Sequence, residues 1–255
     1  MTLAGKIVVV AGVGAGLGTA VVSVLASEGA TVIAVARTSK ALAPVEAHAS
    51  TRGWKVSART ADLLDSAQVE QLVAGIVAEF GRIDGVSLNV GHWLGGETLL
   101  HRLSEEEWSG ALRDNLDPVY RVGRAVLPRL IERGGGALVV VSAAPAVRLA
   151  GSASYCAAKG GLAVLVPKLA HDYRSTGVRI NAVLPGSMSN RLDSLDPPLP
   201  DRPVALTSET PTSPWEVARA IAYLLSDESR WVTGTLLTVD GGATSGGAEP
   251  SPRAS

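Results

Sequence analysis

This sequence of 255 residues contains little cysteine and histidine, and its net charge is close to zero. The one cysteine, Cys156, excludes an internal disulfide and is compatible with a reducing compartment. A net charge of −1 at pH 7 gives no indication of a nucleic-acid or membrane-surface partner. No apolar run approaches the roughly 20 residues that span a bilayer, and no signal-like segment precedes the first predicted strand. We therefore expect a cytoplasmic protein with no membrane partner.

Histidine, a common zinc ligand, is equally sparse. The four histidines are scattered along the chain, at His48, His92, His101 and His171. Because they lack the spacing of a zinc site, we predict no metal centre. What the chain does contain is 46% apolar residues, enough for a sizeable core. Its length suits one large α/β domain or two small ones.

Short apolar runs alternate with helical segments along the chain. The predicted strands are Ile7–Ala11, Thr31–Ala36, Lys55–Arg59, Val86–Asn89, Ala137–Ser142, Val178–Leu184 and Leu236–Val239. Helices are predicted between them, including Leu17–Ser27 and one long helix from a capping box at Ser104 to about Arg133. Because the strands are continuously apolar, helices should cover both faces of the sheet. The prediction is α/β: a single-domain, doubly wound, Rossmann-like sheet of about seven parallel strands.

Two segments depart from this alternation. Residues 187–214 are rich in proline, serine and aspartate, which predicts a long loop beside the substrate. Residues 243–255 contain mainly glycine, serine, proline and alanine, which predicts a flexible C-terminal tail. No linker divides the rest of the chain, so the domain is placed at residues 1–242.

A glycine-rich loop follows the first predicted strand and begins the first predicted helix. It holds four glycines in seven residues, at Gly12, Gly14, Gly16 and Gly18. Phosphate oxygens can approach such a backbone closely and bind the N–H groups of the helix start. Glycines also make tight turns without any ligand, but this number at this position favours a nucleotide site.

The end of the second predicted strand bears on the choice of cofactor. An acidic residue there would bind a ribose 2′-hydroxyl and favour NAD. The sequence instead reads Ala36-Arg37-Thr38-Ser39. The Arg37 guanidinium suits a 2′-phosphate through charge-assisted hydrogen bonds, although an exposed arginine at the start of a helix is common. We predict NADP(H) in preference to NAD(H).

Tyr155 and Lys159 are the most informative pair for chemistry. They lie four residues apart in a predicted helix, so the phenol and the ammonium share one face. A free phenol has a pKa near 10, and a cation one turn away stabilises its phenolate. Ser142, at the end of a predicted strand, supplies a hydroxyl that can polarise a carbonyl. Together these groups predict proton transfer to or from a carbonyl or alcohol oxygen.

These motifs, in this order and spacing, resemble the short-chain dehydrogenase/reductase family of the compact, single-domain type, from about Leu3 to Gly242. The family's Thr-Gly-x-x-x-Gly-x-Gly loop matches from Gly12 onward, with Ala11 in place of Thr. Its Asn-Asn-Ala-Gly element is present as Leu88-Asn89-Val90-Gly91, with the first Asn replaced. Other matches are Asp62, Asn115, the segment Asn181–Gly186, where Asn190 replaces the family's usual Thr, and the segment Val239–Gly242.

The resemblance implies specific roles. Asn115, Ser142, Tyr155 and Lys159 would be the catalytic residues, with Asn115 holding a water and Lys159 binding the nicotinamide ribose. The cofactor would be bound by residues at the carboxyl ends of the strands, namely Gly12, Gly14, Ala15, Gly16, Leu17, Gly18, Arg37, Thr38, Asp62, Leu63, Asn89, Val90, Gly91, Tyr155, Lys159, Pro185, Gly186 and Met188. Related enzymes commonly form tetramers, so a homo-oligomer, either a tetramer or a dimer, is expected.

The substrate is defined less sharply. The expected lining residues are mostly small or apolar: His92, Trp93, Ala144, Leu149 and Met188. They predict a small, mostly apolar ketone or secondary alcohol. One alternative is a catalytically silent NADP-binding regulatory or scaffolding protein, which could lose Tyr155 freely. Another is a sugar-nucleotide epimerase, for which the chain after Gly186 leaves little room.

Overall fold

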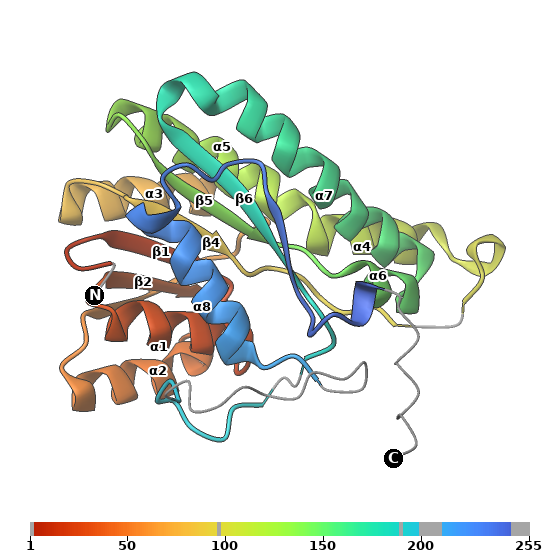
Figure 1. Ribbon diagram of the computed structural model, residues 1–255, viewed down its shortest axis with the longest axis horizontal. Helices are drawn as coiled ribbons and strands as arrows, with labels where there is room; N and C mark the ends of the chain where they lie inside the picture. Colours follow the sequence, from red (N-terminus) through yellow and green to blue (C-terminus); the bar gives the residue numbers. More distant parts are fainter. Residues whose placement is uncertain (1–2, 96–97, 189–190, 199–210, 246–255) are drawn as a thin grey trace, which may run out of the picture.

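The computed structural model describes residues 3–95, 98–188, 191–198 and 211–245. Within them lies one seven-stranded parallel sheet, drawn in Figure 1. Its strands are β1 (Ile7–Ala11), β2 (Thr31–Ala36), β3 (Val56–Thr60), β4 (Gly85–Leu88), β5 (Gly136–Val141), β6 (Val178–Pro185) and β7 (Leu236–Val239). The spatial order is β3-β2-β1-β4-β5-β6-β7. The chain order reverses between β1 and β4, and ligands of such sheets bind at the carboxyl ends of the strands beside this switch.

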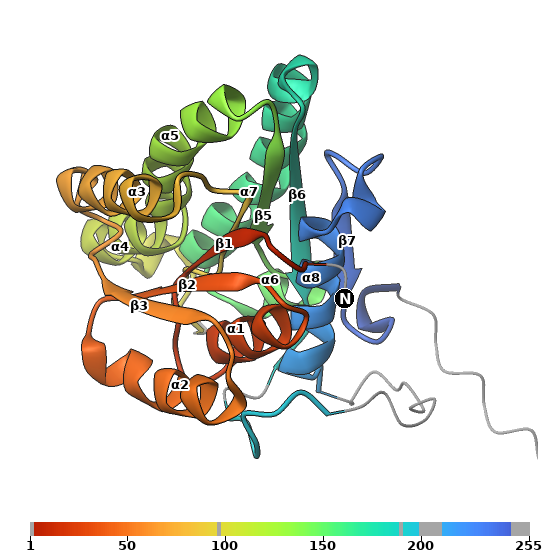
Figure 2. The same cartoon turned by 90° about the vertical axis from the view of Figure 1, so that its left-hand side faces the viewer.

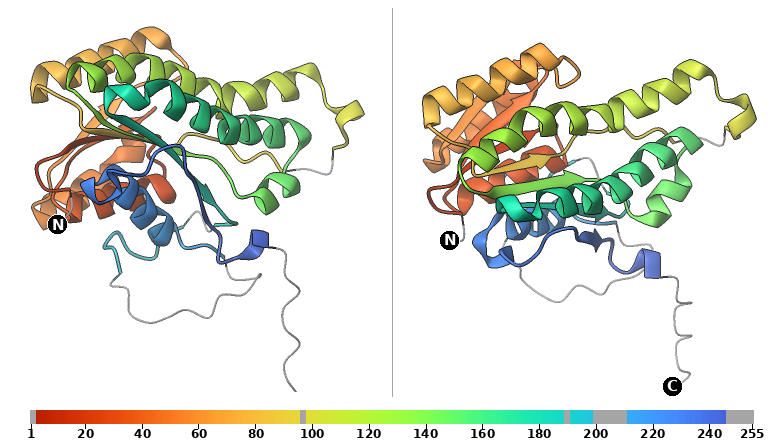
Figure 3. Two further views of the ribbon diagram at one scale, coloured as in Figure 1. Left: turned by 45° about the horizontal axis from the view of Figure 1, so that its top comes forward. Right: turned by 90° about the horizontal axis from the view of Figure 1, so that it is seen from above.

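Helices cover both faces of the sheet, as Figure 2 shows. One face carries α1 (Leu17–Ser27), α2 (Ser39–Arg52) and α8 (Pro214–Leu225). The other carries α3 (Ser66–Phe80), α4 (Glu105–Asn115), α5 (Asp117–Glu132) and α7 (Ala153–Tyr173), which lie side by side in Figure 3. A short helix, α6 (Pro145–Ala150), precedes α7. The predicted doubly wound α/β fold is confirmed.

The core consists of two apolar layers, one on each side of the sheet. Successive side chains of β5 alternate between them: Leu138 and Val140 pack with α3, α5 and α7, whereas Val139 and Val141 pack with α1 and α8. This is the period of two that a strand imposes. Because both layers are buried, every position of the strand is apolar, which explains why the strand sequences show no polar alternation.

Element boundaries agree closely with the sequence, with one correction. The strands β1, β2 and β7 and the helix α1 have the predicted limits, and β3, β4 and β5 are shifted by one residue. The predicted long helix is instead two helices, α4 and α5, separated at Leu116. Pro118 has no backbone N–H to bond one turn back, so a continuous helical ladder is broken at this point. The break leaves Asn115 as the last residue of α4.

The first three residues of the predicted tail have regular structure. Ala243–Ser245 forms a short 3-10 turn, and the Asp240 carboxylate accepts a hydrogen bond of 2.8 Å from the Thr244 N–H. Residues 246–255 lie outside the described residues, as do 189–190 and 199–210 of the predicted substrate loop. In the described part of that loop, Asp196 contacts α2, with 2.9 Å between its carboxylate and Nε2 of His48. The domain limits stay a prediction.

In the described part of the chain, no helix combines the length and the apolar character that crossing a membrane would require.

Candidate active site

The glycine loop between β1 and α1 is shaped by close backbone approaches. Gly12 has φ of +97°, and a Cβ there would lie 3.0 Å from the carbonyl carbon of Asn89. A Cβ on Gly18 would lie 2.4 Å from the Gly12 carbonyl oxygen, so this glycine lets α1 pack against the loop. Gly14 is different, because its Cβ would meet nothing within 4 Å. Its exposed backbone leaves the outer side of the loop open to a ligand.

Asn89 supplies an independent sign that the site is built for a bound group. The Ser87 hydroxyl donates to Oδ1 of Asn89 at 3.0 Å. The amide nitrogen, Nδ2, is buried and has no hydrogen-bond partner among the described residues. Buried polar atoms without a partner are rare. A dinucleotide along the β1–β4 switch would supply an acceptor, so the residues present fit a nicotinamide dinucleotide.

The residues expected at the adenosine end lie at the carboxyl ends of β2 and β3. Arg37 and Thr38 are exposed, and no described residue forms an ion pair with Arg37. Asp62 makes a local turn, in which its Oδ1 accepts from the Leu64 N–H at 2.9 Å. Leu63 is buried and packs in the core rather than facing solvent. Arg37 is therefore a cation available to an incoming phosphate at this end.

Tyr155 and Lys159 lie on α7, as predicted. The Ser152 side chain caps this helix by accepting from the Tyr155 N–H at 3.2 Å. The Tyr155 ring packs edge-to-face on the Trp93 indole, with 4.8 Å between centroids. A Cβ on Gly151 would lie 2.6 Å from the same ring. The cap therefore fixes the backbone of Tyr155, and the indole and the backbone of Gly151 fix its ring.

Lys159, Asn115 and Gly91 converge at the end of β4. The Lys159 ammonium donates to the carbonyls of Val90 at 3.3 Å and Val141 at 3.2 Å. A Cβ on Gly91 would lie 2.5 Å from this ammonium and 2.8 Å from Oδ1 of Asn115. Only glycine fits between the two side chains, which accounts for the Gly91 of the Asn-x-Gly element.

The side chains of Asn115 and Ser142 both form hydrogen bonds with backbone groups. The Asn115 amide accepts from the His92 N–H at 3.1 Å and donates to the His92 carbonyl at 3.2 Å. It thereby fixes the loop that follows β4. The Ser142 hydroxyl donates to the Lys159 carbonyl at 2.7 Å, so its proton points toward α7. To donate to a substrate oxygen instead, this hydroxyl must rotate about its χ1 angle.

Burial shifts the pKa values of the central pair in opposite directions. It raises the pKa of the Tyr155 phenol to about 12 and lowers the pKa of the Lys159 ammonium to about 8. In both cases the low-polarity surroundings disfavour the charged form. The expected stabilisation of the phenolate by Lys159 is thus not realised while the ammonium contacts Val90 and Val141. The phenol remains a proton donor, and the lysine can change its charge near neutral pH.

The predicted substrate-lining residues separate into two groups. His92 and Leu149 are exposed, and Trp93 is half-exposed where it covers Tyr155. The loop that carries Trp93 is joined to the start of α7 by an isolated bridge between Gly95 and Gly151. Ala144 is 0% exposed, so its place in the predicted lining is wrong for this structure. Its N–H donates to the Pro185 carbonyl at 2.8 Å, which draws the residue into the core.

The last residue of β6, Pro185, and the segment after it, with Gly186 and Met188, lie at the same edge. Met188 forms an isolated bridge with Thr212, on the far side of the loop. A Cβ on Gly186 would lie 2.5 Å from the Thr212 hydroxyl, and the Gly186 N–H donates to the Val239 carbonyl at 2.9 Å. This packing holds the segment beside the carboxyl ends of β6 and β7.

Comparisons with known proteins agree with this geometry. The family model described as Enoyl-(Acyl carrier protein) reductase matches residues 12–244. The 3-oxoacyl-[acyl-carrier-protein] reductase FabG of Thermotoga maritima is 33% identical over 95% of this chain and 99% of its own. The FabG protein of Escherichia coli K12 is 30% identical over 95% and 98%. The chain belongs to the short-chain dehydrogenase/reductase family. It is accordingly an NAD(P)-dependent oxidoreductase, and the predicted resemblance is confirmed.

Solved structures of other proteins have the same fold as this chain. A 3-ketoacyl-ACP reductase from Sinorhizobium meliloti 1021 has a TM-score of 0.82 and 30% identity, covering 94% of this chain and 99% of its own. The citronellol catabolism dehydrogenase AtuB of Pseudomonas aeruginosa PAO1 has a TM-score of 0.83 and 28% identity, covering 95% and 96%. Dehydrogenases with differently named substrates therefore share this fold, and the substrate must be inferred from the site.

Sequence reasoning missed three residues that shape the site of this short-chain dehydrogenase/reductase. Ser152 caps α7, Thr212 packs on the Gly186 segment, and Ser87 orients Asn89. The Ser152-x-x-Tyr155 spacing is a helix N-terminus signal that could have been recognised. The Ser87–Asn89 contact joins residues two apart, which the sequence reasoning overlooked, whereas the contact of Thr212 with Gly186 joins distant segments that no local pattern reveals.

Proposed function

We propose that this short-chain dehydrogenase/reductase uses NADP(H) to reduce the ketone of a 3-oxoacyl thioester, with Tyr155 as the proton donor. The observation that carries the proposal is the convergence of the Lys159 ammonium and the Asn115 amide at Gly91. The Ser142 hydroxyl is bonded to the backbone of Lys159, and Tyr155 lies one turn before Lys159 on α7. A proton donor, a cation and a hydroxyl within one small region match the needs of a carbonyl that gains negative charge at its oxygen.

When bound, the cofactor supplies or accepts the hydride. The protein's part is to position the carbonyl and to deliver the proton. The carbonyl carbon gains a hydride, its oxygen takes the Tyr155 proton, and the product is a secondary alcohol. With a pKa of about 12, the phenol is protonated and ready to donate throughout the physiological range. Lys159 then balances the phenolate once its ammonium turns from the carbonyls of Val90 and Val141, and Ser142 hydrogen-bonds the substrate oxygen after its hydroxyl rotates.

The proposed substrate is larger than the small, mostly apolar ketone that the sequence predicted. Two relatives are named as 3-oxoacyl-[acyl-carrier-protein] reductases, and this supports an acyl ketone. Apolar side chains are exposed on both segments that flank Tyr155: Trp93 at 47% and Leu149 at 81%. Covering them with an acyl chain is favourable, at about 25 cal/mol per Å² of apolar surface.

Preference for NADP(H) over NAD(H) belongs to the same proposal and rests on Arg37. This guanidinium is exposed beside the glycine loop and has no ion-pair partner among the described residues. Arginine binds phosphate through paired, charge-assisted hydrogen bonds. No acid occupies the end of β2 to bind a free 2′-hydroxyl or to repel a 2′-phosphate.

Oligomeric state and location remain predictions. Tyr120 on α5 and Val164 on α7 are 61% and 74% exposed, which supports a homotetramer or a dimer formed through these helices. Light scattering on the purified protein measures the molar mass. A cytoplasmic location is the prediction from the sequence.

A catalytically silent binding protein is not favoured as an alternative function, because the chain belongs to a family of oxidoreductases and retains all four candidate residues.

A substrate panel tests the proposed function. Purified protein is assayed with NADPH and with NADH against 3-oxoacyl thioesters of increasing chain length, on coenzyme A and on acyl carrier protein, and against small cyclic ketones. We expect the highest kcat/KM for a 3-oxoacyl thioester with NADPH. Turnover of small ketones alone would restore the prediction made from the sequence, and the absence of turnover with every substrate would contradict the proposal.

A further inference from the structure

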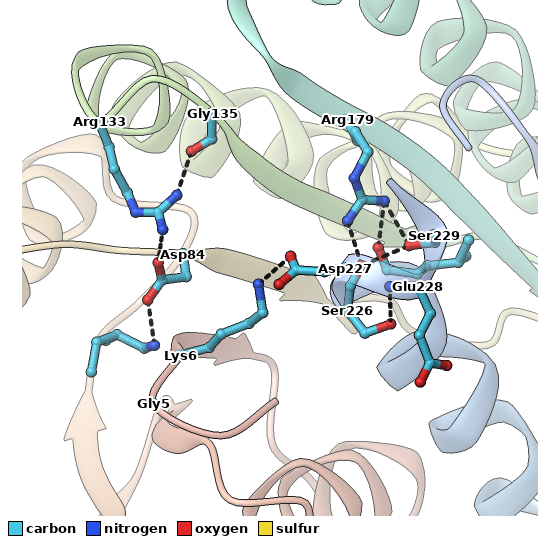
Figure 4. Close-up of polar contacts among 12 residues, drawn as sticks. Gly5, Lys6, Asp84, Arg133, Gly135, Arg179, Ser226, Asp227, Glu228 and Ser229 are labelled. Atoms are coloured by element: carbon cyan, nitrogen blue, oxygen red, sulfur yellow. Dashed lines mark hydrogen bonds and ion pairs between the residues drawn. The ribbon is translucent and has the colours of Figure 1, made fainter. Parts of the chain in front are cut away.

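A cavity lies at the amino ends of the strands, on the edge of the sheet away from the candidate active site. Its volume is about 700 Å³, within the usual range for small-molecule sites. Residues from the starts of β1, β4, β5 and β6 and from the turn before β7 line it; Figure 4 shows part of this wall. Its cationic side chains are Lys6, Arg133, Arg174, Arg179 and Arg230. Two carboxylates, Asp84 and Asp227, oppose these five cations, which leaves an excess of three positive charges.

Two of the cations are neutralised by carboxylates and have a structural role. Lys6 pairs with Asp227 at 2.6 Å, and Arg133 pairs with Asp84 at 2.5 Å. These contacts tie the turn after α8 to the start of β1, and the end of α5 to the start of β4 (Figure 4). Structural pairing therefore accounts for both carboxylates but for only part of the positive charge.

Arg179 is the clearest cation without a carboxylate partner. Its guanidinium donates to the carbonyls of Leu224 at 2.8 Å and Ser226 at 3.0 Å, and to the Ser229 hydroxyl at 2.8 Å. Burial lowers the pKa of this arginine, although the guanidinium keeps its charge. No ion pair of the described residues includes it. The direct contacts of this partly buried charge are all neutral acceptors, and the Asp227 carboxylate acts on it only at longer range, so a further anion beside it is favoured.

The positive charge around the cavity affects the pKa of Asp227, its exposed carboxylate. The pKa of Asp227 is lowered first by its hydrogen bond with Lys6, and also by the charges of Arg179 and Arg133. Three cations, from the starts of β1 and β6 and from the end of α5, therefore act on one point of the cavity. An anionic group placed there would be stabilised in the same way as this carboxylate.

Arg230 and Trp231 stand together at the rim. The Arg230 side chain has no hydrogen-bond or ion-pair partner among the described residues. The Trp231 side chain is 96% exposed although it is the largest apolar side chain lining the cavity. An arginine binds phosphate, and an indole offers a face on which a nucleobase can stack. Both groups are available to one ligand that combines a phosphate with a planar ring.

We propose that this cavity is a second binding site, which takes a nucleoside phosphate. The phosphate groups lie among Arg179, Arg230 and the Lys6–Asp227 pair, and the base stacks on Trp231. The site is separate from the dinucleotide site, because it is formed by the amino ends of the strands and the glycine loop follows a carboxyl end. It does not depend on the proposed reduction of a 3-oxoacyl thioester.

Calorimetry on the full chain tests the proposal. The glycine loop is first saturated with NADPH, whose fluorescence reports that it stays bound, and ADP is then titrated. We expect one further ADP site per chain, with binding that weakens as salt is added. Adenosine and inorganic phosphate, which each lack one half of the ligand, should bind more weakly than ADP.

Two exposed substitutions give the sharpest comparison. Arg230→Ala and Trp231→Ala should each weaken ADP binding by about tenfold or more, without loss of folding, because neither side chain is buried. The matched control is Arg124→Ala on α5, which removes an exposed arginine far from the cavity and should leave ADP binding unchanged. Turnover with NADPH should be the same in all three variants.

Three results would overturn the proposal. The first is no ADP binding at millimolar concentration while NADPH remains bound. The second is ADP binding of wild-type strength in the Arg230→Glu, Trp231→Ala double variant. The third is a change in molar mass on Trp231→Ala without any ADP binding, which would identify this face as a contact between copies of the chain.

Discussion

At the carboxyl edge of the sheet the buried cation is Lys159, whereas at the amino edge the partly buried cation is Arg179. Both donate to backbone carbonyls, and neither forms an ion pair with a carboxylate in the described chain. Their chemistry differs. Burial brings the pKa of Lys159 down to about 8, so its charge can change near neutral pH, but Arg179 stays charged at every pH the fold survives. The carboxyl edge therefore suits proton transfer, and the amino edge suits fixed charge.

The largest expected effect is at the carboxyl edge. Tyr155→Phe removes the proton donor and keeps the ring that packs on Trp93. We expect kcat to fall by roughly 10²–10⁴-fold, the usual contribution of general acid catalysis, with NADPH affinity unchanged. The control is Tyr120→Phe, which changes an exposed tyrosine on α5. Steady-state rates and fluorescence titration measure both quantities, and near-wild-type turnover would remove Tyr155 from the mechanism.

Lys159→Met tests whether burial lowers the pKa of the Lys159 ammonium in the folded protein. Between pH 8 and 10.5 the unfolded chain binds the lysine proton and the folded chain does not, so the free energy of unfolding rises with pH across this window. The variant lacks that rise. Over the window the wild type should gain up to about 3 kcal/mol relative to the variant. Urea unfolding at several pH values measures the difference, and parallel curves would show that the lysine is not perturbed.

The same variant reports on function. Removing the ammonium should reduce both turnover and NADPH affinity if Lys159 serves the phenol and the ribose. A fall in turnover with an unchanged dissociation constant would contradict the ribose contact. Lys159→Arg should not restore full activity, because a Cβ at Gly91 would already meet the ammonium at 2.5 Å and a planar guanidinium is larger.

Arg179→Met makes the corresponding change at the amino edge. It leaves the carbonyls of Leu224 and Ser226 without this donor at the end of α8. We expect a loss of about 1–3 kcal/mol in the free energy of unfolding. Unlike the effect at Lys159, this loss should be the same from pH 7 to pH 10. Urea unfolding at pH 7 and at pH 10 measures the loss. A loss that varied with pH would contradict the claim that Arg179, unlike Lys159, keeps a fixed charge.

The smallest effect is expected at the exposed Arg37. Arg37→Ala should weaken NADPH binding by roughly tenfold, since one exposed charge-assisted contact is lost, and should leave NADH nearly untouched. Lys40→Ala, at the start of α2, is the control. Ala36→Asp should shift the preference towards NADH. Catalytic efficiencies with both cofactors measure this, and a wild type that already prefers NADH would show that Arg37 is only a surface residue.

The sequence predicted the strands better than the helix that carries Asn115. Strands such as Ile7–Ala11 are short, continuously apolar and bounded by glycine or charged residues, so their limits are locally encoded. The break at Leu116 was missed because the segment from Ser104 to Arg133 has helical character on both sides of it. Ala144 was assigned to the substrate surface from its place near Ser142, but tertiary packing buries it under Pro185.

By itself, the sequence determined the α/β class, the glycine loop, the order of the motifs and the i,i+4 relation of Tyr155 and Lys159. All of these follow from local periodicity and spacing, which short segments carry without help from the rest of the chain. Only the tertiary structure decided the contacts of the cations. Lys159 meets the carbonyl of Val90, 69 residues away, and Arg179 meets Leu224, 45 residues away. Burial and hydrogen bonding depend on what packs around a group, so its charge state and its availability to a ligand exist only once the strands have assembled.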